Sequence, residues 1–497
     1  MALLNRDDWY DIARDVDWTL SYVDRAVAFP EEWKGEKDIC GTAWDDWDEP
    51  FRVSFREYVM VQRDKEASVG AIREAMVRAK AYEKLDDGHK ATSHLHMGTI
   101  TMVEHMAVTM QSRFVRFAPS ARWRSLGAFG MLDETRHTQL DLRFSHDLLN
   151  DSPSFDWSQR AFHTDEWAVL ATRNLFDDIM LNADCVEAAL ATSLTLEHGF
   201  TNIQFVALAS DAMEAGDVNF SNLLSSIQTD EARHAQLGFP TLDVMMKHDP
   251  KRAQQILDVA FWRSYRIFQA VTGVSMDYYT PVAKRQMSFK FEMLEWIVKH
   301  HERILRDYGL QKPWYWDTFE KTLDHGHHAL HIGTWFWRPT LFWDPNGGVS
   351  REERRWLNQK YPNWEESWGV LWDEIISNIN AGNIEKTLPE TLPMLCNVTN
   401  LPIGSHWDRF HLKPEQLVYK GRLYTFDSDV SKWIFELDPE RYAGHTNVVD
   451  RFIGGQIQPM TIEGVLNWMG LTPEVMGKDV FNYRWAGDYA ENRIAAE

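Results

Sequence analysis

Cysteine, positive charge and long apolar runs are all scarce in this chain of 497 residues. The three cysteines, Cys40, Cys185 and Cys396, are scattered and odd in number, so they offer no disulfide framework. Lys and Arg total 52 against 74 Asp and Glu, and the net charge of −22 argues against nucleic acid or an anionic membrane as a partner. No stretch approaches about 18 uninterrupted apolar residues, and charges occupy the N-terminus where a secretory peptide has an apolar run. We therefore expect a soluble, cytoplasmic protein that acts on small molecules or on other proteins.

Glycine-rich phosphate-binding loops of both common types are also missing from the sequence. Nucleotide chemistry on this chain is therefore not expected. Any NADH or flavin that supports its activity should lie on a partner protein.

What the chain does contain is a duplicated pentapeptide, Asp-Glu-x-Arg-His, at residues 133–137 and 230–234. Within each copy the Glu and the His are three residues apart, so on a helix both side chains point to one position in space. An earlier helix-like stretch brings one further glutamate to each copy. Two Glu-x-x-His pairs with two single glutamates are the ligand set of a carboxylate-bridged two-metal site in a ferritin-like four-helix bundle. The candidate metal ligands are Glu104, Glu134, His137, Glu197, Glu231 and His234.

Charge balance supports the same interpretation. A single Glu-x-x-His pair is common on exposed helices, but here both copies are longer and lie among apolar residues. Six carboxylates against Arg136 and Arg233 leave four uncompensated negative charges near one core, and burying each costs at least several kcal/mol. Metal ions or protons must neutralise them. Asp133 and Asp230 are expected to accept the second ring N–H of the metal-bound histidines.

The apolar residues recur at helical spacing from about residue 55 to 310. A mainly α fold follows, with a ferritin-like four-helix bundle at about 90–246 inside a larger helical core. The ligand-bearing helices are expected at about 90–117, 121–149, 183–213 and 217–246. A further helical stretch at 164–180 supplies the long crossover that this topology needs.

The sequence changes character after Cys396. Residues 416–419 and 423–426 form a short hairpin around Lys420-Gly421, and a helix follows near 428–435. We therefore divide the chain into a helical core, 1–395, and a small C-terminal α+β region, 396–497.

The densest group of histidines lies at 325–331. His327 and His331 have the spacing of zinc-binding helices, but the glutamate of His-Glu-x-x-His is missing. We favour structural, hydrogen-bonding histidines over a second metal site.

Several longer strings resemble a known family. They are Leu4–Asp11, Ser225–Glu231, Met276–Pro281, Lys312–Asp317 and Glu390–Pro393. Through nearly its whole length the chain resembles the alpha subunit of bacterial multicomponent di-iron monooxygenase hydroxylases, most closely the toluene and isoprene (alkene) group. The resemblance implies that the six candidate ligands hold two iron ions. The expectation of iron rather than manganese rests on this resemblance alone, because the ligands suit both metals.

The resemblance also implies roles for three polar residues. Thr201, one turn after Glu197, is expected to assist O2 activation and proton movement. Asn202 and Gln228 are similar to the family's polar residues on the path from the site to the surface where an effector protein docks. The alternative for Thr201 is a helix hydroxyl that bonds to a carbonyl one turn back.

A hydrocarbon pocket can be proposed from helix faces beside the ligands. Relatives that hydroxylate aromatic rings tend to carry a small residue at the position of Val103 and Phe at that of Leu196. The more aliphatic residues here favour epoxidation of a short alkene such as isoprene, with toluene hydroxylation as the alternative. The purely structural interpretation of these apolar residues is ordinary core packing. The proposed pocket residues are Ile100, Val103, Ala107, Phe176, Leu196 and Phe205.

The family resemblance further implies partners: beta and gamma hydroxylase subunits in a paired α2β2γ2-like assembly, a small effector protein, and a ferredoxin with an NADH-dependent reductase. It implies that the iron–sulfur and flavin centres lie on these partner proteins and not on this chain. Residues 417–442 are similar to a small domain that binds zinc through cysteines in some phenol-oxidising relatives. Here Cys396 stands alone, and Thr399 and Asp427 occupy positions of other cysteines. We therefore expect no structural zinc.

Three hypotheses remain from the sequence. The first is the catalytic alpha subunit of a monooxygenase that acts on a short alkene or a small aromatic. The second keeps the di-iron bundle but makes the protein a desaturase or a ribonucleotide reductase radical subunit. The third is a non-catalytic subunit retained for assembly.

Overall fold

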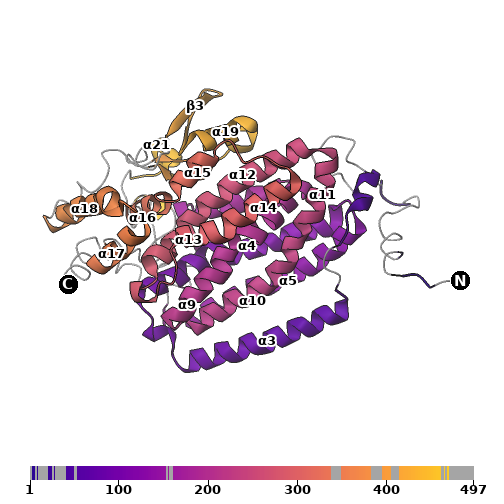
Figure 1. The fold of residues 1–497 in the computed structure, drawn as a ribbon, viewed down its shortest axis with the longest axis horizontal. Helices are drawn as coiled ribbons and strands as arrows, with labels where there is room; N and C mark the ends of the chain where they lie inside the picture. The colour runs from indigo at the N-terminus through magenta and orange to yellow at the C-terminus, as the bar shows by residue number, and fades with distance from the viewer. Residues whose placement is uncertain are drawn as a thin grey trace.

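Helices dominate the computed structural model, which describes residues 41–49, 53–152, 160–336, 349–381, 394–403 and 413–459 with a few isolated positions. The long helices run nearly side by side and form the body of the molecule (Figure 1). Within these residues no helix combines the length and apolar character that a membrane crossing requires. The mainly α fold with a small C-terminal region of short strands is confirmed.

The elements of the helical body follow in chain order. The α-helices are α3 (Phe55–Arg78), α4 (Asp87–Phe117), α5 (Ala121–Leu148), α7 (Trp167–Phe176), α8 (Cys185–Ala188), α9 (Ala209–Ala215), α10 (Val218–His234), α11 (Gly238–His248), α12 (Pro250–Phe268), α13 (Phe289–Glu292), α14 (Lys299–Tyr308), α15 (Trp316–Thr322), α16 (Gly326–Phe336), α17 (Arg351–Lys360) and α18 (Val370–Asn380). The π-helical segments are η4 (Asp177–Asn182), η5 (Ala189–Phe200), η6 (Ile203–Leu208), η8 (Gln269–Gly273), η9 (Ser275–Tyr279), η11 (Met293–Val298) and η13 (Glu365–Gly369). Short 3-10 turns are η2 (Gly41–Asp46), η3 (Tyr82–Lys84), η7 (Ala235–Leu237) and η10 (Val282–Lys284).

Local signals set the starts and ends of the bundle helices. Asp86 caps α4 by accepting from the Gly88 N–H at 2.9 Å, and Asp217 caps α10 by accepting from the Phe220 N–H at 3.0 Å. Gly216 adopts a φ of 90°, a left-handed conformation that ends α9 and turns the chain into α10. The boundaries of α4 and α5 fall within a few residues of the predicted ones.

The third bundle helix differs from the regular helix expected at 183–213. It begins as α8, continues through the π-helical η5 and η6, and ends as α9. The wider turn is visible in the Thr195 hydroxyl, which donates to the carbonyl oxygen of Leu190, five residues earlier, at 2.9 Å. π-Helical turns are rare and are found frequently at functional sites. A pattern based on 3.6 residues per turn could not reveal them.

The fourth predicted helix, 217–246, is also interrupted. The chain forms α10, a 3-10 turn at η7 and then α11. Pro240 in the first turn of α11 has no N–H to continue the preceding hydrogen bonds. Gly238 packs directly on Leu194 of η5, and a Cβ at this glycine would lie 2.4 Å from the Cβ of Leu194. The break therefore lets α11 approach the π-helical segment closely.

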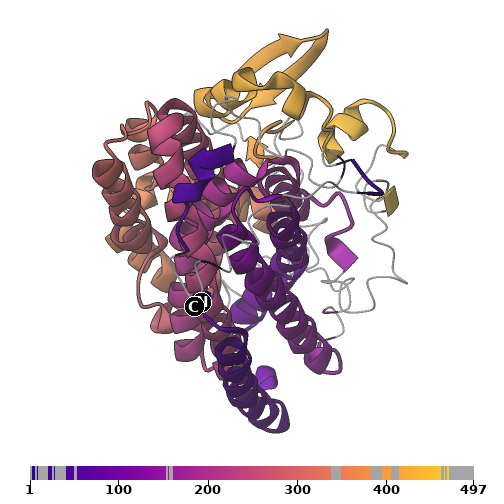
Figure 2. The same cartoon turned by 90° about the vertical axis from the view of Figure 1, so that its right-hand side faces the viewer.

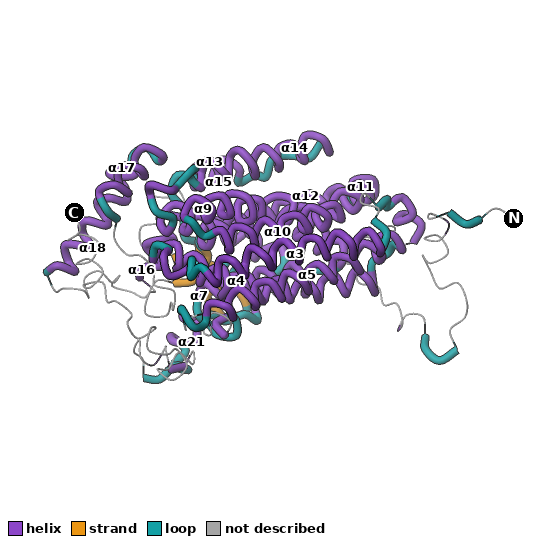
Figure 3. Tube along the Cα trace, turned by 90° about the horizontal axis from the view of Figure 1, so that it is seen from below, coloured by secondary structure: helices purple, strands orange, loops and turns teal. Residues whose placement is uncertain are grey.

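A separate helix covers the outside of the bundle. α3 lies along one edge, next to α10 and α5 (Figure 1), and the helices remain nearly parallel when seen from below (Figure 3). Ser54 and Glu57 form a capping box at its start. Its buried positions include Tyr58, Gln62 and Val69, so the helix places two polar side chains against the bundle.

The C-terminal region sits on one side of the helical body, next to α12 and α15 (Figure 1), and it remains at the edge of the molecule in the view turned by 90° (Figure 2). The predicted hairpin forms: Tyr419 pairs with Arg422 around the turn at Lys420 and Gly421. A second ladder pairs β1 with β2, across the proposed boundary at 395 and 396, so the domain division stays a prediction. The elements are β1 (Met394–Leu395), β2 (Pro402–Ile403), β3 (Glu415–Tyr419), β4 (Arg422–Phe426), α19 (Asp429–Leu437), α20 (Pro439–Ala443) and α21 (Val448–Ile453).

Several sequence features fall outside the described residues. These are Cys40, the strings 6–7, 9–11 and 390–393, and nearly all of the chain after residue 459.

Candidate metal centre

The bundle brings all six candidate ligands together in its core. They form two overlapping groups of four, and the potential ligand atoms within each group lie within 4.8 Å of one another. Glu134 and Glu231 belong to both groups, which is the placement expected of carboxylates that bridge two metals. Every one of the six side chains is buried. The first group is Glu104, Glu134, His137 and Glu231, and the second is Glu134, Glu197, Glu231 and His234.

Both histidines turn the Nδ1 atom of the ring toward the glutamates. His137 Nδ1 lies 3.2 Å from Oε2 of Glu104 and 3.2 Å from Oε2 of Glu134. His234 Nδ1 lies 2.9 Å from Oε1 of Glu134 and 3.7 Å from Oε2 of Glu231. Because three residues are close to one helical turn, α5 and α10 each present a glutamate and a histidine on one face. The two helices therefore supply matching pairs to a single centre.

The other ring nitrogen of each histidine faces an aspartate of the opposite motif. Nε2 of His137 lies 3.3 Å from Oδ2 of Asp230, and Nε2 of His234 lies 3.0 Å from Oδ2 of Asp133. A carboxylate in this position holds the proton on Nε2 and leaves the Nδ1 lone pair for a metal. The sequence predicted both aspartates as histidine partners. Each aspartate contacts the histidine of the other helix, and this arrangement follows only from the packing of α5 against α10.

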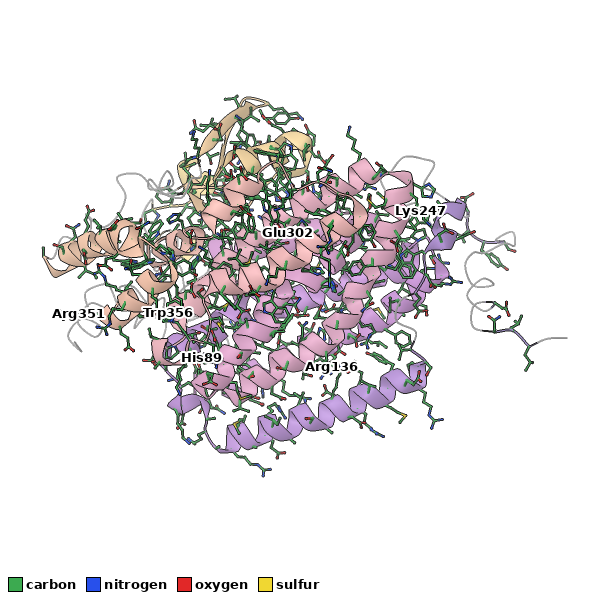
Figure 4. All side chains as sticks on the ribbon, viewed as in Figure 1. His89, Arg136, Lys247, Glu302, Arg351 and Trp356 are labelled. Carbon is green, nitrogen blue, oxygen red and sulfur yellow. The ribbon has the colours of Figure 1, made fainter. Side chains whose placement is uncertain are left out.

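The two arginines of the motifs hold the same aspartates. Arg136 Nη1 lies 2.9 Å from Oδ2 of Asp230, and Arg233 Nε lies 3.1 Å from Oδ2 of Asp133. Arg136 lies on the side of the bundle that α3 covers (Figure 4), where its Nε donates to Glu66 at 2.7 Å. The arginines therefore hold both aspartates in an orientation that faces the histidine rings.

Residues of α3 complete this layer, and the sequence analysis missed them. The Tyr58 hydroxyl donates to Oδ1 of Asp133 at 2.8 Å, and Gln62 Nε2 lies 2.8 Å from Oδ1 of both Asp133 and Asp230. Lys65 Nζ lies 2.5 Å from Oδ1 of Asp230. These three side chains are spaced by four and three residues, the signal of one helix face. Nothing in the sequence says which part of the bundle that face covers.

The electrostatics of the cluster reflect crowded negative charge. Burial raises the pKa of Glu104 and of Glu197 well above the ordinary value, and the charge of Glu231 raises both further. Burial alone would lower the pKa of His137 and His234, but the surrounding carboxylates outweigh burial and raise it well above the usual range. The carboxylates thus favour positive charge at their centre.

The donor atoms fit a pair of metal ions. Within the described part of the chain, Oε1 of Glu134, Oε2 of Glu197 and Nδ1 of His234 are buried without a hydrogen-bond partner. Glu134 Oε1 and His234 Nδ1 are 2.9 Å apart but lack the alignment of a hydrogen bond. Buried polar atoms are rarely left unsatisfied. A mixed set of carboxylate oxygens and imidazole nitrogens suits iron or manganese, which would satisfy them.

A cavity of about 40 Å³ borders the cluster and shares its four glutamates. Three further residues that the sequence analysis did not propose also line it: Met180, Gln204 and Phe268. Met180 comes from the crossover and Phe268 from α12, elements whose position against the bundle cannot be read from periodicity. The structure places all six proposed pocket residues in the lining, which contains Ile100, Val103, Ala107, Phe176, Leu196 and Phe205.

Thr201 lies at the end of η5 and lines the same cavity. Its hydroxyl donates to the carbonyl oxygen of Glu197 at 2.7 Å, the bond that its alternative, structural interpretation expects. Asn202 is not among the residues that line the cavity; it accepts from Nε2 of Gln228 at 2.9 Å, while its own Nδ2 donates to the carbonyl of His198 at 2.9 Å. Asn202 and Gln228 form a partly buried polar pair between η5 and α10.

The histidines at 325–331 form structural hydrogen bonds. Nε2 of His327 lies 2.8 Å from Oδ2 of Asp277, and Nδ1 of His328 lies 2.6 Å from the Tyr278 hydroxyl. Among the described residues, the groupings close enough to hold a metal are the two at the bundle centre. The favoured interpretation of these histidines agrees with this arrangement.

Cys396, Thr399 and Asp427, which the sequence analysis considered for a zinc site, are connected by hydrogen bonds. Cys396 Sγ accepts from the N–H of Thr399 at 3.4 Å, and the Thr399 hydroxyl donates to Asp427 at 3.1 Å. Asp427 also accepts from the buried Arg266 of α12 at 3.1 Å. The expectation of no structural zinc stays a prediction.

Comparisons with known proteins agree with this geometry. Residues 18–249 match the methane/phenol/alkene hydroxylase family, and residues 403–446 match the YHS domain. The chain is 27% identical to the oxygenase component DmpN of phenol 2-monooxygenase from Pseudomonas sp. (strain CF600), over 93% of this chain and 89% of that protein. It is 23% identical to the methane monooxygenase component A alpha chain of Methylococcus capsulatus (strain Bath), over 84% and 81% of the two chains.

One solved structure shares the complete fold. The crystal structure of xenon-pressurised phenol hydroxylase from Pseudomonas sp. OX1 matches with a TM-score of 0.83 and 24% identity, and the match covers 100% of both chains.

Removal of a shared glutamate should affect iron binding more than removal of an unshared one. Glu231 belongs to both groups and Glu104 to one. We expect Glu231→Ala to lose nearly all bound iron and Glu104→Ala to keep part of it. The measurement is iron per chain by mass spectrometry, with circular dichroism to verify folding. Equal iron content in the two variants would contradict the shared role of Glu231.

The contribution of α3 can be tested at Gln62. Gln62→Leu removes the donor to both aspartates at similar volume, and loss of such supporting bonds typically weakens metal affinity about 10- to 100-fold. We expect faster removal of iron by a ferrous chelator. Arg63→Leu, on the exposed face of the same helix, is the matched control and should release iron at the wild-type rate.

Proposed function

We propose that this chain, the large subunit of a di-iron monooxygenase in the methane/phenol/alkene hydroxylase family, inserts one atom of O2 into a small hydrocarbon. The observation that carries the proposal is the apolar cavity beside the buried cluster of glutamates and histidines. When bound, two iron ions supply the redox chemistry that activates O2. The residues proposed to hold them are Glu104, Glu134, His137, Glu197, Glu231 and His234.

The chain's own residues provide the environment for this reaction. The apolar lining excludes water and holds a hydrocarbon against the metal ligands. We propose that the Thr201 hydroxyl moves protons, and its position in the lining of the cavity, beside the glutamates, supports this role. Asp133 and Asp230 keep the histidine rings in one tautomer. We further propose that Asn202 and Gln228 lie on the path between the site and a docked effector protein.

The substrate that we propose is a short alkene such as isoprene, with epoxidation as the reaction. Relatives named above act on phenol and methane, and a further relative from Rhodococcus jostii is a propane 2-monooxygenase. Two aliphatic residues, Val103 and Leu196, favour the alkene. The polar lining side chains other than the glutamates are already engaged: Thr201 with a carbonyl and Gln204 with His96 at 3.3 Å. Such a lining suits a hydrocarbon better than a phenol, and toluene is the alternative substrate.

The partners are proposed from the family and from the sequence. The relatives are named as components or large subunits, so beta and gamma subunits, an effector protein and an electron-transfer chain are proposed here too. We propose that a reductase binds NADH and that a ferredoxin delivers the electrons; the lack of a phosphate-binding loop in this sequence is compatible with this division. The acidic composition and cysteine usage favour a cytoplasmic location. The family match to hydroxylases argues against a desaturase or a radical subunit. The complete set of ligands argues against a non-catalytic subunit.

The substrate can be decided by competition. The co-expressed hydroxylase complex is supplied with effector, electrons and ¹⁸O2, and receives isoprene, toluene and phenol together. We expect labelled isoprene epoxide to exceed labelled cresol and catechol. Cresol in excess would support the aromatic alternative, catechol in excess would make the enzyme a phenol hydroxylase, and no label in any product would reject the monooxygenase proposal.

Thr201→Ala tests the proton role. The variant should keep full iron content, because the hydroxyl bonds to a carbonyl and not to the donor atoms. We expect the yield of product per O2 consumed to fall about tenfold, which corresponds to about 1.4 kcal/mol. Thr201→Ser retains the hydroxyl and is the control. Wild-type coupling in Thr201→Ala would leave the residue with its helical hydrogen bond alone.

A further inference from the structure

The C-terminal region contacts one wall of the cavity. η4 carries Met180, which lines the cavity, two residues after Asp178. Arg441 of α20 reaches this segment: its Nε donates to Oδ1 of Asp178 at 2.5 Å. The same guanidinium lies 2.7 Å from Oε1 of Glu187 in α8, the helix that leads into η5 and its ligand. Arg441 of the C-terminal region thus connects η4, which forms this wall of the cavity, with α8.

This contact is mostly buried and electrically balanced. The side chains of Asp178 and Arg441 are 9% and 16% exposed. Asp178 is also paired with Arg263 of α12 and accepts from Nδ2 of Asn182 at 2.9 Å. Burial raises the pKa of Asp178, but the charges of Arg263 and Arg441 outweigh burial and lower the pKa below its usual value. Two arginines and two carboxylates form a neutral network, so each partner is needed to balance the others.

External contacts have to hold η4 because its own structure is weak. π-Helical turns are seldom stable over several residues, and η4 ends at Ala183 in an extended conformation. Arg113 of α4 binds the backbone at this end, with Nη1 donating to the carbonyls of Met180 and Leu181 at 2.7 and 2.9 Å. Arg113 therefore fixes the backbone of the wall, while Arg441 fixes the side chain of Asp178 in the same segment.

Packing alone does not restrain the wall on the side of the C-terminal region. A cavity of about 100 Å³ borders the contact and is lined by Ile179, Glu187, Ala191, Arg441 and Tyr442 among others. Ile179 is the neighbour of Met180. The segment has room to shift into this cavity, and the ion pairs of Arg441 oppose the shift.

We propose that Arg441 is a positioning residue of the monooxygenase: it ties the C-terminal region to Asp178 and Glu187, and so sets the position of Met180 in the wall that orients the substrate. This inference rests on the proposed function. It gives the YHS-like region, 403–446, a part in selectivity, although none of the residues of this region that the structure describes lines the cavity beside the metal ligands. A purely structural role, in which Arg441 only attaches the region, is the alternative.

The test compares Arg441→Gln with Arg422→Gln in the complete hydroxylase complex. Arg422 pairs with Asp450 at 2.9 Å, and both residues belong to the C-terminal region, so this control breaks a similar ion pair away from the wall. Isoprene is an informative substrate because its two double bonds are inequivalent and give two epoxides. Hydrogen–deuterium exchange provides a second readout that does not depend on turnover.

For Arg441→Gln we expect exchange of residues 177–188 to rise about tenfold, exchange of residues 415–437 to stay unchanged, and iron content to remain at the wild-type level. The ratio of the two epoxides should change at least about twofold, with a larger effect on KM than on kcat. Arg441→Lys, which keeps the charge, should recover part of both effects. It also replaces Arg441→Gln if that variant does not fold.

The outcomes separate the inference from the proposed function. A wild-type complex that forms no epoxide, cresol or catechol rejects the proposed function, and the exchange data still decide whether Arg441 holds the wall. An unchanged epoxide ratio with unchanged exchange at 177–188 overturns the positioning role. Equal loosening of both segments, or the same changes in Arg422→Gln, also overturns it, since Arg441 would then serve attachment alone.

Discussion

Four buried glutamates around one point are the constraint on which the rest of this structure depends. Carboxylates removed from water repel one another and are strongly destabilising unless cations or protons balance them. Two histidines surround the glutamates, two aspartates contact the histidines, and two arginines contact the aspartates, so the sign of the charge alternates outward from the centre. The cluster is therefore destabilising without positive charge and is well suited to hold metal ions.

The layer of aspartates, arginines and α3 side chains around the cluster explains why the bundle needs more than four helices. Asp133 and Asp230 each receive bonds from the opposite motif and from α3, so that α3, α5 and α10 share one polar network. Gln62 bridges the two aspartates and links the two repeated halves of the bundle directly. A metal-binding bundle of this kind is rigid because its second layer of hydrogen bonds connects the helices, in addition to their apolar packing.

The side of the cluster that faces the cavity is built differently. There the third bundle helix is π-helical, and the crossover supplies a π-helical segment of its own. Such turns place side chains where a regular helix cannot, at the cost of weaker internal hydrogen bonding. Contacts from other elements compensate for this weakness: Gly238 of α11 packs against η5, and Arg113 of α4 and Arg441 of α20 hold η4. The shape of the cavity thus depends on elements distant in sequence, including the C-terminal region.

The sequence alone determined the mainly α fold, the helices that carry the ligands, and the six residues that converge at the centre. It could do so because Glu-x-x-His spacing and helical periodicity are local, and the motif is duplicated. The apolar residues next to the ligands followed from the same helix faces. Only the tertiary structure decided that Asp133 and Asp230 act across helices, that α3 brings Tyr58 and Gln62, and that Met180 and Phe268 reach the cavity. Those facts depend on how separate helices pack and on π-helical turns, and neither leaves a periodic signal in the chain.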